Sequence, residues 1–281
     1  MSTAPVNPPP TPAPVSTAAA APARDGRARI TAVTSGKGGV GKTFVSANLA
    51  AALTRRGEKV LVLDADLGLA NLDVVLNLFP KITLHDVFTG KAELEDAILP
   101  APGGFSVLLA GSGLVEYSRL TADVREKLQD VIQRVAPRFD RILLDTGAGI
   151  SDVVLYAVSL ADSVLVVATP EPTSLTDAYA TIKVLVAQQN RRAIKLVVNQ
   201  VNRIGEGRVI RGQLQQVLDR FVNPTLPVEA GSTGVKLDLL GEIPIDLAVR
   251  EAIQKRQLLL EWMPGCEAAK GIRAVAEKLA P

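Results

Sequence analysis

Between a short apolar run and an alanine-rich segment stands the stretch Gly36-Lys37-Gly38-Gly39-Val40-Gly41-Lys42-Thr43. It satisfies the pattern G-x-x-x-x-G-K-T, in which glycines allow backbone N–H groups to converge on phosphate oxygens. The N-terminus of the following helix adds partial positive charge. Lys42 is placed to reach the β- and γ-phosphates, and the Thr43 hydroxyl to bind Mg²⁺. The stretch therefore predicts a nucleoside triphosphate site at a strand–loop–helix junction.

Around this loop, short Val/Ile/Leu-rich runs alternate with longer helical patterns. Runs with little polar alternation are typical of strands that are covered on both faces. We expect strands at Arg29–Thr34, Lys59–Asp64, Ser106–Leu109, Arg141–Asp145, Ser163–Ala168 and Lys195–Asn199. We expect helices at Lys42–Arg56, Ala122–Ala136, Asp152–Leu160, Ser174–Gln189 and Gly207–Phe221. The alternation predicts an α/β fold of the P-loop NTPase kind, a mostly parallel sheet with helices on both faces.

The N-terminal stretch differs in composition from the rest of the chain. The first 28 residues hold seven prolines and eight alanines, and the first charged side chain is Arg24. Such a segment buries too little apolar surface to offset its ordering entropy. We therefore expect a disordered Pro/Ala-rich tail over 1–28 and one folded domain over 29–281.

Composition excludes several classes of protein. The 281 residues carry a formal net charge of +2, which gives no general electrostatic footprint for nucleic acid, and we expect no specific nucleic-acid partner. Cys266 is the single cysteine, so an internal disulfide and a multi-cysteine metal centre within one subunit are excluded. No charge-free apolar run reaches about 18 residues, and no secretory signal pattern opens the chain. A cytoplasmic location is the simplest expectation.

Three aspartates fall where two of the expected strands end. Asp64 and Asp66 close one strand two residues apart, and Asp145 closes another. Ligands of a parallel sheet sit beyond the carboxyl ends of the strands, and residues two apart share a face. A triphosphate site needs carboxylates for Mg²⁺ or its waters and a group that orients the attacking water. Strand-end aspartates also cap turns, but three in this order favour a nucleotide site.

The loop resembles that of the deviant Walker A ATPases, the MinD/ParA group, whose pattern KGGxGKT is met by Lys37–Thr43. The resemblance implies ATP and Mg²⁺ as cofactors and a homodimer in which Lys37 reaches the nucleotide of the second subunit. It also implies that Asp66 positions the water. Asp64 would assist near the metal, and Asp145 would be the Walker B carboxylate. Together with Lys37 and Lys42, Asp66 would form the catalytic set.

The same resemblance places the base. Family members use an asparagine at the position of Asn199 for adenine, and an amide both donates to and accepts from a base edge. The segment Gly241-Glu242-Ile243-Pro244 resembles the second segment that flanks the base, which makes Ile243 and Pro244 candidate contacts. Without the resemblance, Asn199 serves equally well as a turn former.

Two further stretches resemble the flagellar number regulators of the FlhG/FleN group. These are Leu144–Ser151 and Thr169–Tyr179, while Asp64–Asp73 continues as in MinD-like proteins. This implies a switch that controls flagellar number or placement. Its partners would be an FlhF-type GTPase, flagellar C-ring proteins or a flagellar transcription regulator. The tail lacks the DQAxxLR-type segment of many relatives, which puts stimulation of the GTPase by that route in doubt.

Alternatives stay open at this point. One is a division-site or cargo-positioning ATPase, and another is a nucleotide-gated adaptor whose hydrolysis is incidental. Turnover is expected to be slow without a partner. The family's C-terminal helix often binds the inner face of the cell membrane. Here the apolar face of that helix is small and flanked by both charge signs, so core packing is an equal alternative; its members are Ala268, Ile272, Val275 and Leu279.

Overall fold

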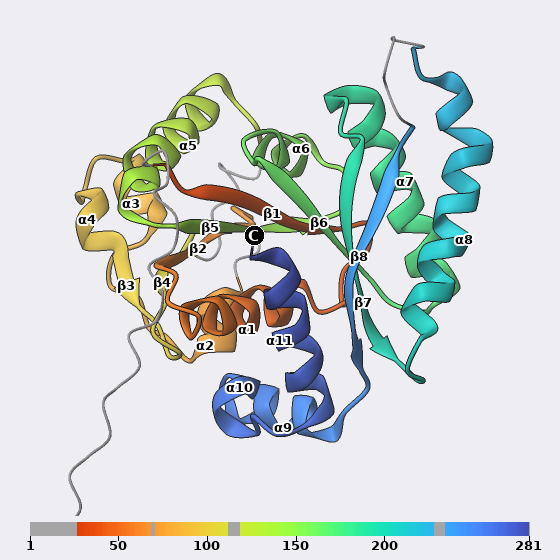
Figure 1. Ribbon diagram of the computed structural model, residues 1–281. Helices are drawn as coiled ribbons and strands as arrows, with labels where there is room; N and C mark the ends of the chain where they lie inside the picture. The colour runs from red at the N-terminus through yellow and green to blue at the C-terminus, as the bar shows by residue number, and fades with distance from the viewer. Residues whose placement is uncertain (1–26, 69–70, 112–118, 228–233, 281) are drawn as a thin grey trace, which may run out of the picture.

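The computed structural model describes residues 27–68, 71–111, 119–227 and 234–280, and it contains an eight-stranded sheet of order β3-β4-β2-β5-β1-β6-β7-β8 (Figure 1). Every neighbouring pair is parallel except the edge pair β3 and β4. The strands are β1 (Arg29–Ser35), β2 (Val60–Ala65), β3 (Ile98–Pro100), β4 (Ser106–Leu108), β5 (Arg141–Ala148), β6 (Ser163–Ala168), β7 (Ala193–Val201) and β8 (Lys236–Pro244).

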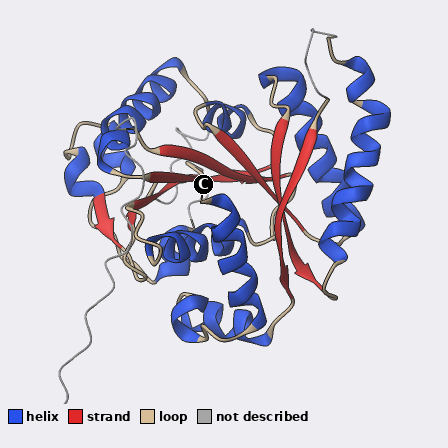
Figure 2. Ribbon diagram, viewed as in Figure 1, coloured by secondary structure: helices blue, strands red, loops and turns tan. Residues whose placement is uncertain are grey.

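Helices cover both faces of this sheet (Figure 2). One face packs against α1, α2 and α9–α11, and the other against α3–α8. In Figure 1, α1 and α11 lie below the central strands and α5 and α6 lie above them. The helices are α1 (Lys42–Thr54), α2 (Leu72–Leu76), α3 (Leu84–Phe88), α4 (Leu94–Ala97), α5 (Ala122–Val135), α6 (Asp152–Ser159), α7 (Pro172–Gln189), α8 (Glu206–Phe221), α9 (Leu247–Lys255), α10 (Leu259–Trp262) and α11 (Glu267–Leu279).

The predicted α/β class, the parallel sheet and the helices on both faces are confirmed. All six expected strands and all five expected helices are present, with ends displaced by a few residues. The largest displacement is in β5, which runs on to Ala148 instead of ending at Asp145. Residues 1–26 of the expected tail lie outside the described residues. Ala28, assigned to the tail, belongs to the fold, because it is buried and its N–H donates to the Ala136 carbonyl at 3.0 Å.

Strand β8 is missing from the elements expected on sequence. Its buried residues recur at every third position, not every second as in a half-buried strand, and Gly241 and Pro244 interrupt the apolar pattern, which makes it resemble a loop. The glycine has a packing reason, since a Cβ there would come within 2.7 Å of Val275 Cγ2 on α11. Helix α11 therefore packs close against the backbone of β8, and this contact fixes the C-terminal helix on the sheet.

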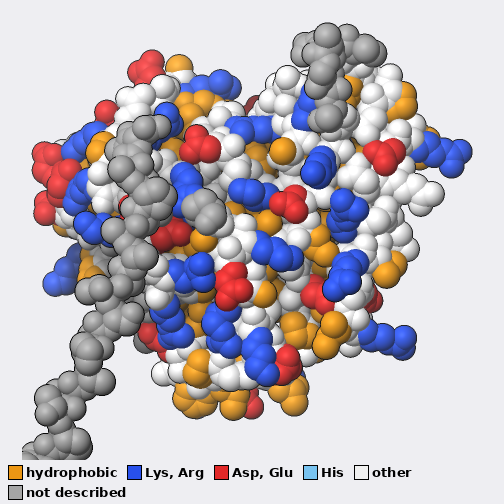
Figure 3. Space-filling model, in the orientation of Figure 1, with side chains coloured by type: hydrophobic (Ala, Val, Ile, Leu, Met, Phe, Trp, Pro, Cys, Tyr) orange, Lys and Arg blue, Asp and Glu red, His pale blue; other side chains and the backbone are white. Residues whose placement is uncertain are grey.

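The apolar face of α11 is part of the core. Ala268, Ile272, Val275 and Leu279 are each at most 4% exposed and pack with α1 and β8. Of the two alternatives for this face, the structure shows core packing, and a membrane contact of the chain stays a prediction. Hydrophobic side chains lie along the lower edge in Figure 3, near α9 and α10, which carry the exposed Leu247 and Trp262. None of the described helices is long and apolar enough to cross a membrane.

Helix α1 supports the loop that precedes it. Eleven of its thirteen residues are buried, because it lies between the sheet and α11 and its small alanines allow close approach. Asn48 ties it to a second element: its amide donates to the Phe44 carbonyl at 2.9 Å and accepts the Leu260 N–H at 3.2 Å. Both bonds are buried, and the second joins the middle of α1 to α10.

Candidate functional site

The loop Gly36–Thr43 joins β1 to α1, and its glycines are required by its geometry. Gly39 and Gly41 have φ values of +80° and +90°, a region that L side chains rarely adopt. A Cβ on Gly41 would also come within 2.5 Å of the Asn199 amide nitrogen. That amide donates to the Val40 carbonyl at 2.8 Å. The end of β7 therefore holds the middle of the loop.

The first part of the loop is held by α7 and by β1. A Cβ on Gly36 would overlap the backbone of Asp177, in the second turn of α7. The Ser35 hydroxyl donates to the Lys37 carbonyl at 2.7 Å. These contacts fix the backbone around Lys37 and do not involve its side chain.

A cavity of about 630 Å³ opens beside the loop at the carboxyl ends of β2 and β5. Its volume lies in the range of small-molecule sites. Its lining residues within the described part of the chain are Gly38, Gly39, Gly41, Lys42, Thr43, Phe44, Ala65, Asp66, Leu67, Gly68, Asn71, Gly147, Ala148, Ser151, Val153 and Val154. The predicted loop and Asp66 are thus brought together around one space.

Asp145 lies beneath the loop and is only 3% exposed. The Ser46 hydroxyl donates to its Oδ1 at 2.8 Å, and the Thr43 side chain is also hydrogen-bonded to it. Burial raises the pKa of Asp145 from 3.8 to about 6, although these hydroxyls and Lys42 act in the opposite direction. Burial lowers the pKa of Lys42, and the charges of Asp145 and Asp66 oppose that shift. A hydroxyl and a carboxylate side by side form the oxygen donor set that Mg²⁺ prefers.

The other two aspartates take different positions. Asp66 lines the cavity and lies against Gly147, where a Cβ would come within 3.3 Å of its carboxylate. Asp64 is 1% exposed and lines a separate cavity of about 310 Å³ together with Asp73. Its Oδ1 accepts the Asp66 N–H at 3.1 Å, and burial raises its pKa well above the ordinary value. Asp64 thus holds the backbone of Asp66, and its role near the metal stays a prediction.

The residues that we expect to contact adenine are buried or already engaged in other contacts. Asn199 is buried in β7 and its amide is used by the loop, while the positive φ of +61° falls on the next residue, Gln200. Ile243 is 1% exposed and belongs to the core. Pro244 is half-buried at the end of β8. The adenine contacts therefore stay a prediction.

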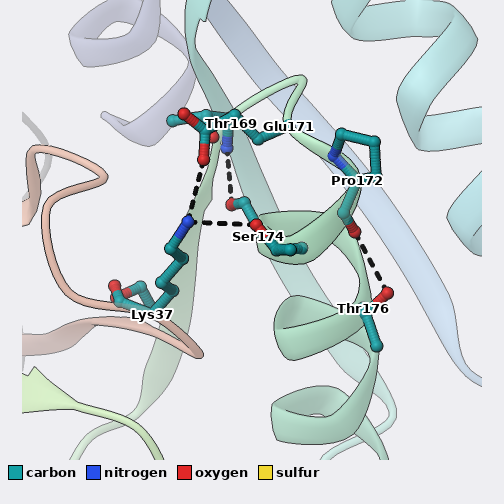
Figure 4. Close-up of polar contacts among 8 residues, drawn as sticks. Lys37, Thr169, Glu171, Pro172, Ser174 and Thr176 are labelled. Atoms are coloured by element: carbon teal, nitrogen blue, oxygen red, sulfur yellow. Dashed lines mark hydrogen bonds and ion pairs between the residues drawn. The ribbon is translucent and has the colours of Figure 1, made fainter.

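Some contacts could not be anticipated from the sequence. The Glu242 carboxylate of β8 accepts the N–H groups of Gly205 at 2.5 Å and Gly207 at 2.7 Å, which places a negative charge at the N-terminus of α8. Within the single chain, Lys37 Nζ donates to Glu171 Oε2 at 2.9 Å and to Thr173 Oγ1 at 3.0 Å (Figure 4), and its reach to the nucleotide of a second subunit stays a prediction. The motif identified Lys37, but no signal in the sequence identified these two partners.

Comparison with known proteins agrees with this geometry. The AAA domain family AAA_31 matches residues 28–197. The antiactivator FleN of Pseudomonas aeruginosa is 41% identical over 251 residues, which are 89% of this chain and 86% of that protein. The chain belongs to the MinD/ParA-type ATPases. The flagellar regulators that the sequence resembled are part of this family.

Two solved structures show the same fold. The cell division ATPase MinD of Pyrococcus furiosus has a TM-score of 0.71 at 30% identity, covering 89% of this chain and 98% of its own. MinD of Pyrococcus horikoshii, solved in complex with Mg-ADP, has a TM-score of 0.68 at 31% identity over 90% and 96% of the two chains. The cofactors of this MinD/ParA-type ATPase are ATP and Mg²⁺.

The residues present fit these cofactors. The glycine backbone has no Cβ where phosphate oxygens would approach, Lys42 would supply a buried cation, and Thr43 and Asp145 would supply oxygens for a metal. Bound Mg²⁺ would neutralise charge that develops on the phosphates. The chain contributes the fixed loop, the cation and the carboxylate Asp66 facing the cavity.

Proposed function

We propose that this ATPase is a switch that dimerises with ATP, hydrolyses it, and thereby regulates the number or placement of flagella. The observation that carries the proposal is the division of labour between two lysines of one loop. Lys42 is 9% exposed beside the cavity, whereas the Lys37 side chain is 40% exposed and points away to α7. A surface lysine that is directed away from its own phosphates can reach those of a second copy once it leaves its partners on α7.

Hydrolysis follows from the groups that face the cavity. In this proposal Asp66 orients the attacking water, and the hold of Asp64 on its backbone and its contact with Gly147 support that role. Lys42 stabilises negative charge on the phosphates. None of the described residues that line the cavity is an arginine, which supports slow turnover until a partner acts.

The first test is biochemical. Asp66→Ala should retain nucleotide binding, lose hydrolysis and accumulate as a dimer in Mg·ATP, because the reaction that reopens the dimer is blocked. Light scattering coupled to size exclusion gives the mass directly. Asp73→Ala is a matched control, being an aspartate near the same strand end that lines the other cavity. A monomeric Asp66→Ala protein in saturating Mg·ATP would refute the dimer.

The flagellar assignment is supported by the similarity to FleN and is tested in the source bacterium. Deleting the gene should change the count or position of flagella per cell in electron micrographs, and wild type but not Lys42→Ala should restore it. An unchanged count with misplaced septa, chromosomes or cargo would favour the second candidate, a positioning ATPase. The structural similarity to MinD cell division ATPases favours that candidate.

An adaptor with incidental hydrolysis differs from a switch in one measurable way. Turnover of the switch should rise when the correct partner is added, because the partner drives the reopening of the dimer. The candidate partners are an FlhF-type GTPase, C-ring proteins and a flagellar transcription regulator. If each binds equally well to wild type and to Asp66→Ala without altering turnover in wild type, the adaptor is the better description.

A further inference from the structure

Strands β7 and β8 lie on one side of the phosphate loop, and the cavity with Asp66 lies on the other. The loop follows the central strand β1, and the cavity opens at the carboxyl ends of β2 and β5. Strands β6, β7 and β8 continue the sheet in the opposite direction (Figure 1). In the proposed reaction the hydrolysed end of the elongated nucleotide faces Asp66, so its base extends toward the carboxyl ends of β7 and β8.

The ends of these two strands form one edge that contacts the loop. The Asn199 amide of β7 donates to the Val40 carbonyl of the loop at 2.8 Å. The register places Asn199 opposite Ile243 of β8, and the Ile245 N–H donates to the Val201 carbonyl at 3.0 Å. The position of β8 at this edge therefore bears on how a bound nucleotide is held.

Glu242 joins this edge to the next helix. Its Oε1 accepts the Gly205 N–H at 2.5 Å and its Oε2 accepts the Gly207 N–H at 2.7 Å, both at the start of α8. Its backbone carbonyl oxygen lies where a Cβ on Gly271 of α11 would come within 2.7 Å. Helix α8 thus holds the side chain of Glu242, and α11 packs against its backbone.

The segment between β7 and α8 has a backbone that needs such support. Gln200 has a φ of +61°, which a residue other than glycine keeps only where its surroundings enforce it. From this geometry we propose that Glu242 is a positioning residue for the nucleotide base, because it fixes the segment after Asn199 against β8. The inference rests on the proposed role of Asp66, which sets the direction of the nucleotide.

The chemistry of this bridge predicts the effect of removing it. A carboxylate accepts both N–H groups, whereas the amide of Glu242→Gln has one acceptor oxygen and turns its own N–H groups toward the second donor. The segment after Asn199 would then move away from β8. The expected loss is that of one hydrogen bond to the base, about 3- to 10-fold in ATP affinity. Contacts of the phosphates with the loop and Lys42 would remain.

The test measures the affinity of the full chain for two ligands with Mg²⁺, a non-hydrolysable ATP analogue and inorganic tripolyphosphate, which lacks the base. Glu242→Gln is compared with Gly207→Ala, whose Cβ would come within 2.7 Å of Glu242 Oε2 and displace the carboxylate from the α8 side. Glu206→Gln is the matched control, since that carboxylate accepts the Asn202 N–H at 2.6 Å within the same segment. Thermal unfolding checks that each variant folds, and Gly207→Ala decides the matter if Glu242→Gln does not.

We expect Glu242→Gln and Gly207→Ala to weaken binding of the ATP analogue by about 3- to 10-fold and binding of tripolyphosphate by less than about twofold. Glu206→Gln should match wild type for both ligands. Equal losses for the two ligands, an unaltered affinity for the ATP analogue, or the same selective loss in Glu206→Gln would overturn the role of Glu242. An Asp66→Ala protein that still hydrolyses ATP would instead overturn the proposed function.

Discussion

Lys42 and Lys37 belong to one glycine-rich loop, but the fold treats its two ends in opposite ways. Lys42 is buried, and the carboxylates of Asp145 and Asp66 act on it electrostatically. Lys37 lies at the surface, where Glu171 and Thr173 hold it by bonds that solvent can replace. Breaking a buried ion pair costs much free energy, whereas an exposed charged side chain exchanges partners at low free-energy cost. In the proposed switch, one loop thus binds a nucleotide through Lys42 and contacts a second subunit through Lys37.

The largest effect is expected when Lys42 is replaced. Lys42→Ala removes charge-assisted contacts to two phosphates and should weaken ATP binding by about 100-fold or more. Lys37→Ala should alter binding to its own nucleotide by no more than about threefold, because its ammonium is directed to α7. Isothermal titration with a non-hydrolysable ATP analogue measures both. Equal losses in the two variants would remove the distinction between the two ends.

A second prediction concerns the carboxylate under the Lys42 end. The folded pKa of Asp145 is about 6 against an ordinary 3.8, so the unfolded chain loses this proton first as pH rises. The contribution of Asp145 to stability therefore falls between about pH 4 and pH 6 and stays unfavourable above, by about 3 kcal/mol.

Asp145→Asn should accordingly stabilise the nucleotide-free protein above pH 6 and flatten its pH dependence between pH 4 and pH 6. Urea unfolding at pH 4.5, 6 and 7.5 measures this. Asp140→Asn is a useful comparison, since that carboxylate accepts the exposed Lys59 N–H at 2.8 Å at the opposite end of β5. An Asp145→Asn protein less stable than wild type at pH 7.5 would contradict the account.

A smaller effect tests the middle of the loop. Gly41→Ala introduces a Cβ at φ +90° and 2.5 Å from the Asn199 amide, and it should cost about 1–3 kcal/mol of unfolding free energy. A Cβ on Gly38 would meet nothing within 4 Å, and Gly38 has no positive φ, so Gly38→Ala should leave the stability of the nucleotide-free protein nearly unaltered. Thermal unfolding compares the two variants. Equal melting temperatures would contradict the claim that Asn199 of β7 holds the loop in place.

Much of this arrangement follows from sequence alone, because its signals are local. The loop pattern fixes Gly36–Thr43 by spacing, and the apolar runs before Asp66 and Asp145 place both carboxylates at the sheet edge. The structure brings the loop and these aspartates together as the parallel topology requires. Helix α11 follows its apolar periodicity, although its target, β8, was not visible.

What the sequence left open depends on contacts between distant residues. Asn199 and Val40 lie 159 positions apart, and Lys37 and Glu171 lie 134 apart. No local sequence pattern predicts contacts between such distant residues. Strand β8 was not predicted because it contains a glycine and a proline, and it packs against α11 only because Gly241 leaves room for Val275. Asp64 shows the limit of spacing arguments, since it precedes Asp66 by two residues but faces another cavity.

The central claim is that Lys37 acts on the nucleotide of the other subunit, and subunit mixing tests it directly. Lys37→Ala and Asp66→Ala should each be inactive alone. In a mixed dimer, the Lys37→Ala subunit keeps its own Asp66 and receives Lys37 from its partner, which rebuilds one complete site. An equimolar mixture should recover up to about a quarter of wild-type ATPase activity, since half of the dimers are mixed and each has one working site. A mixture as inactive as its components would show that Lys37 works only within its own subunit and would contradict the account.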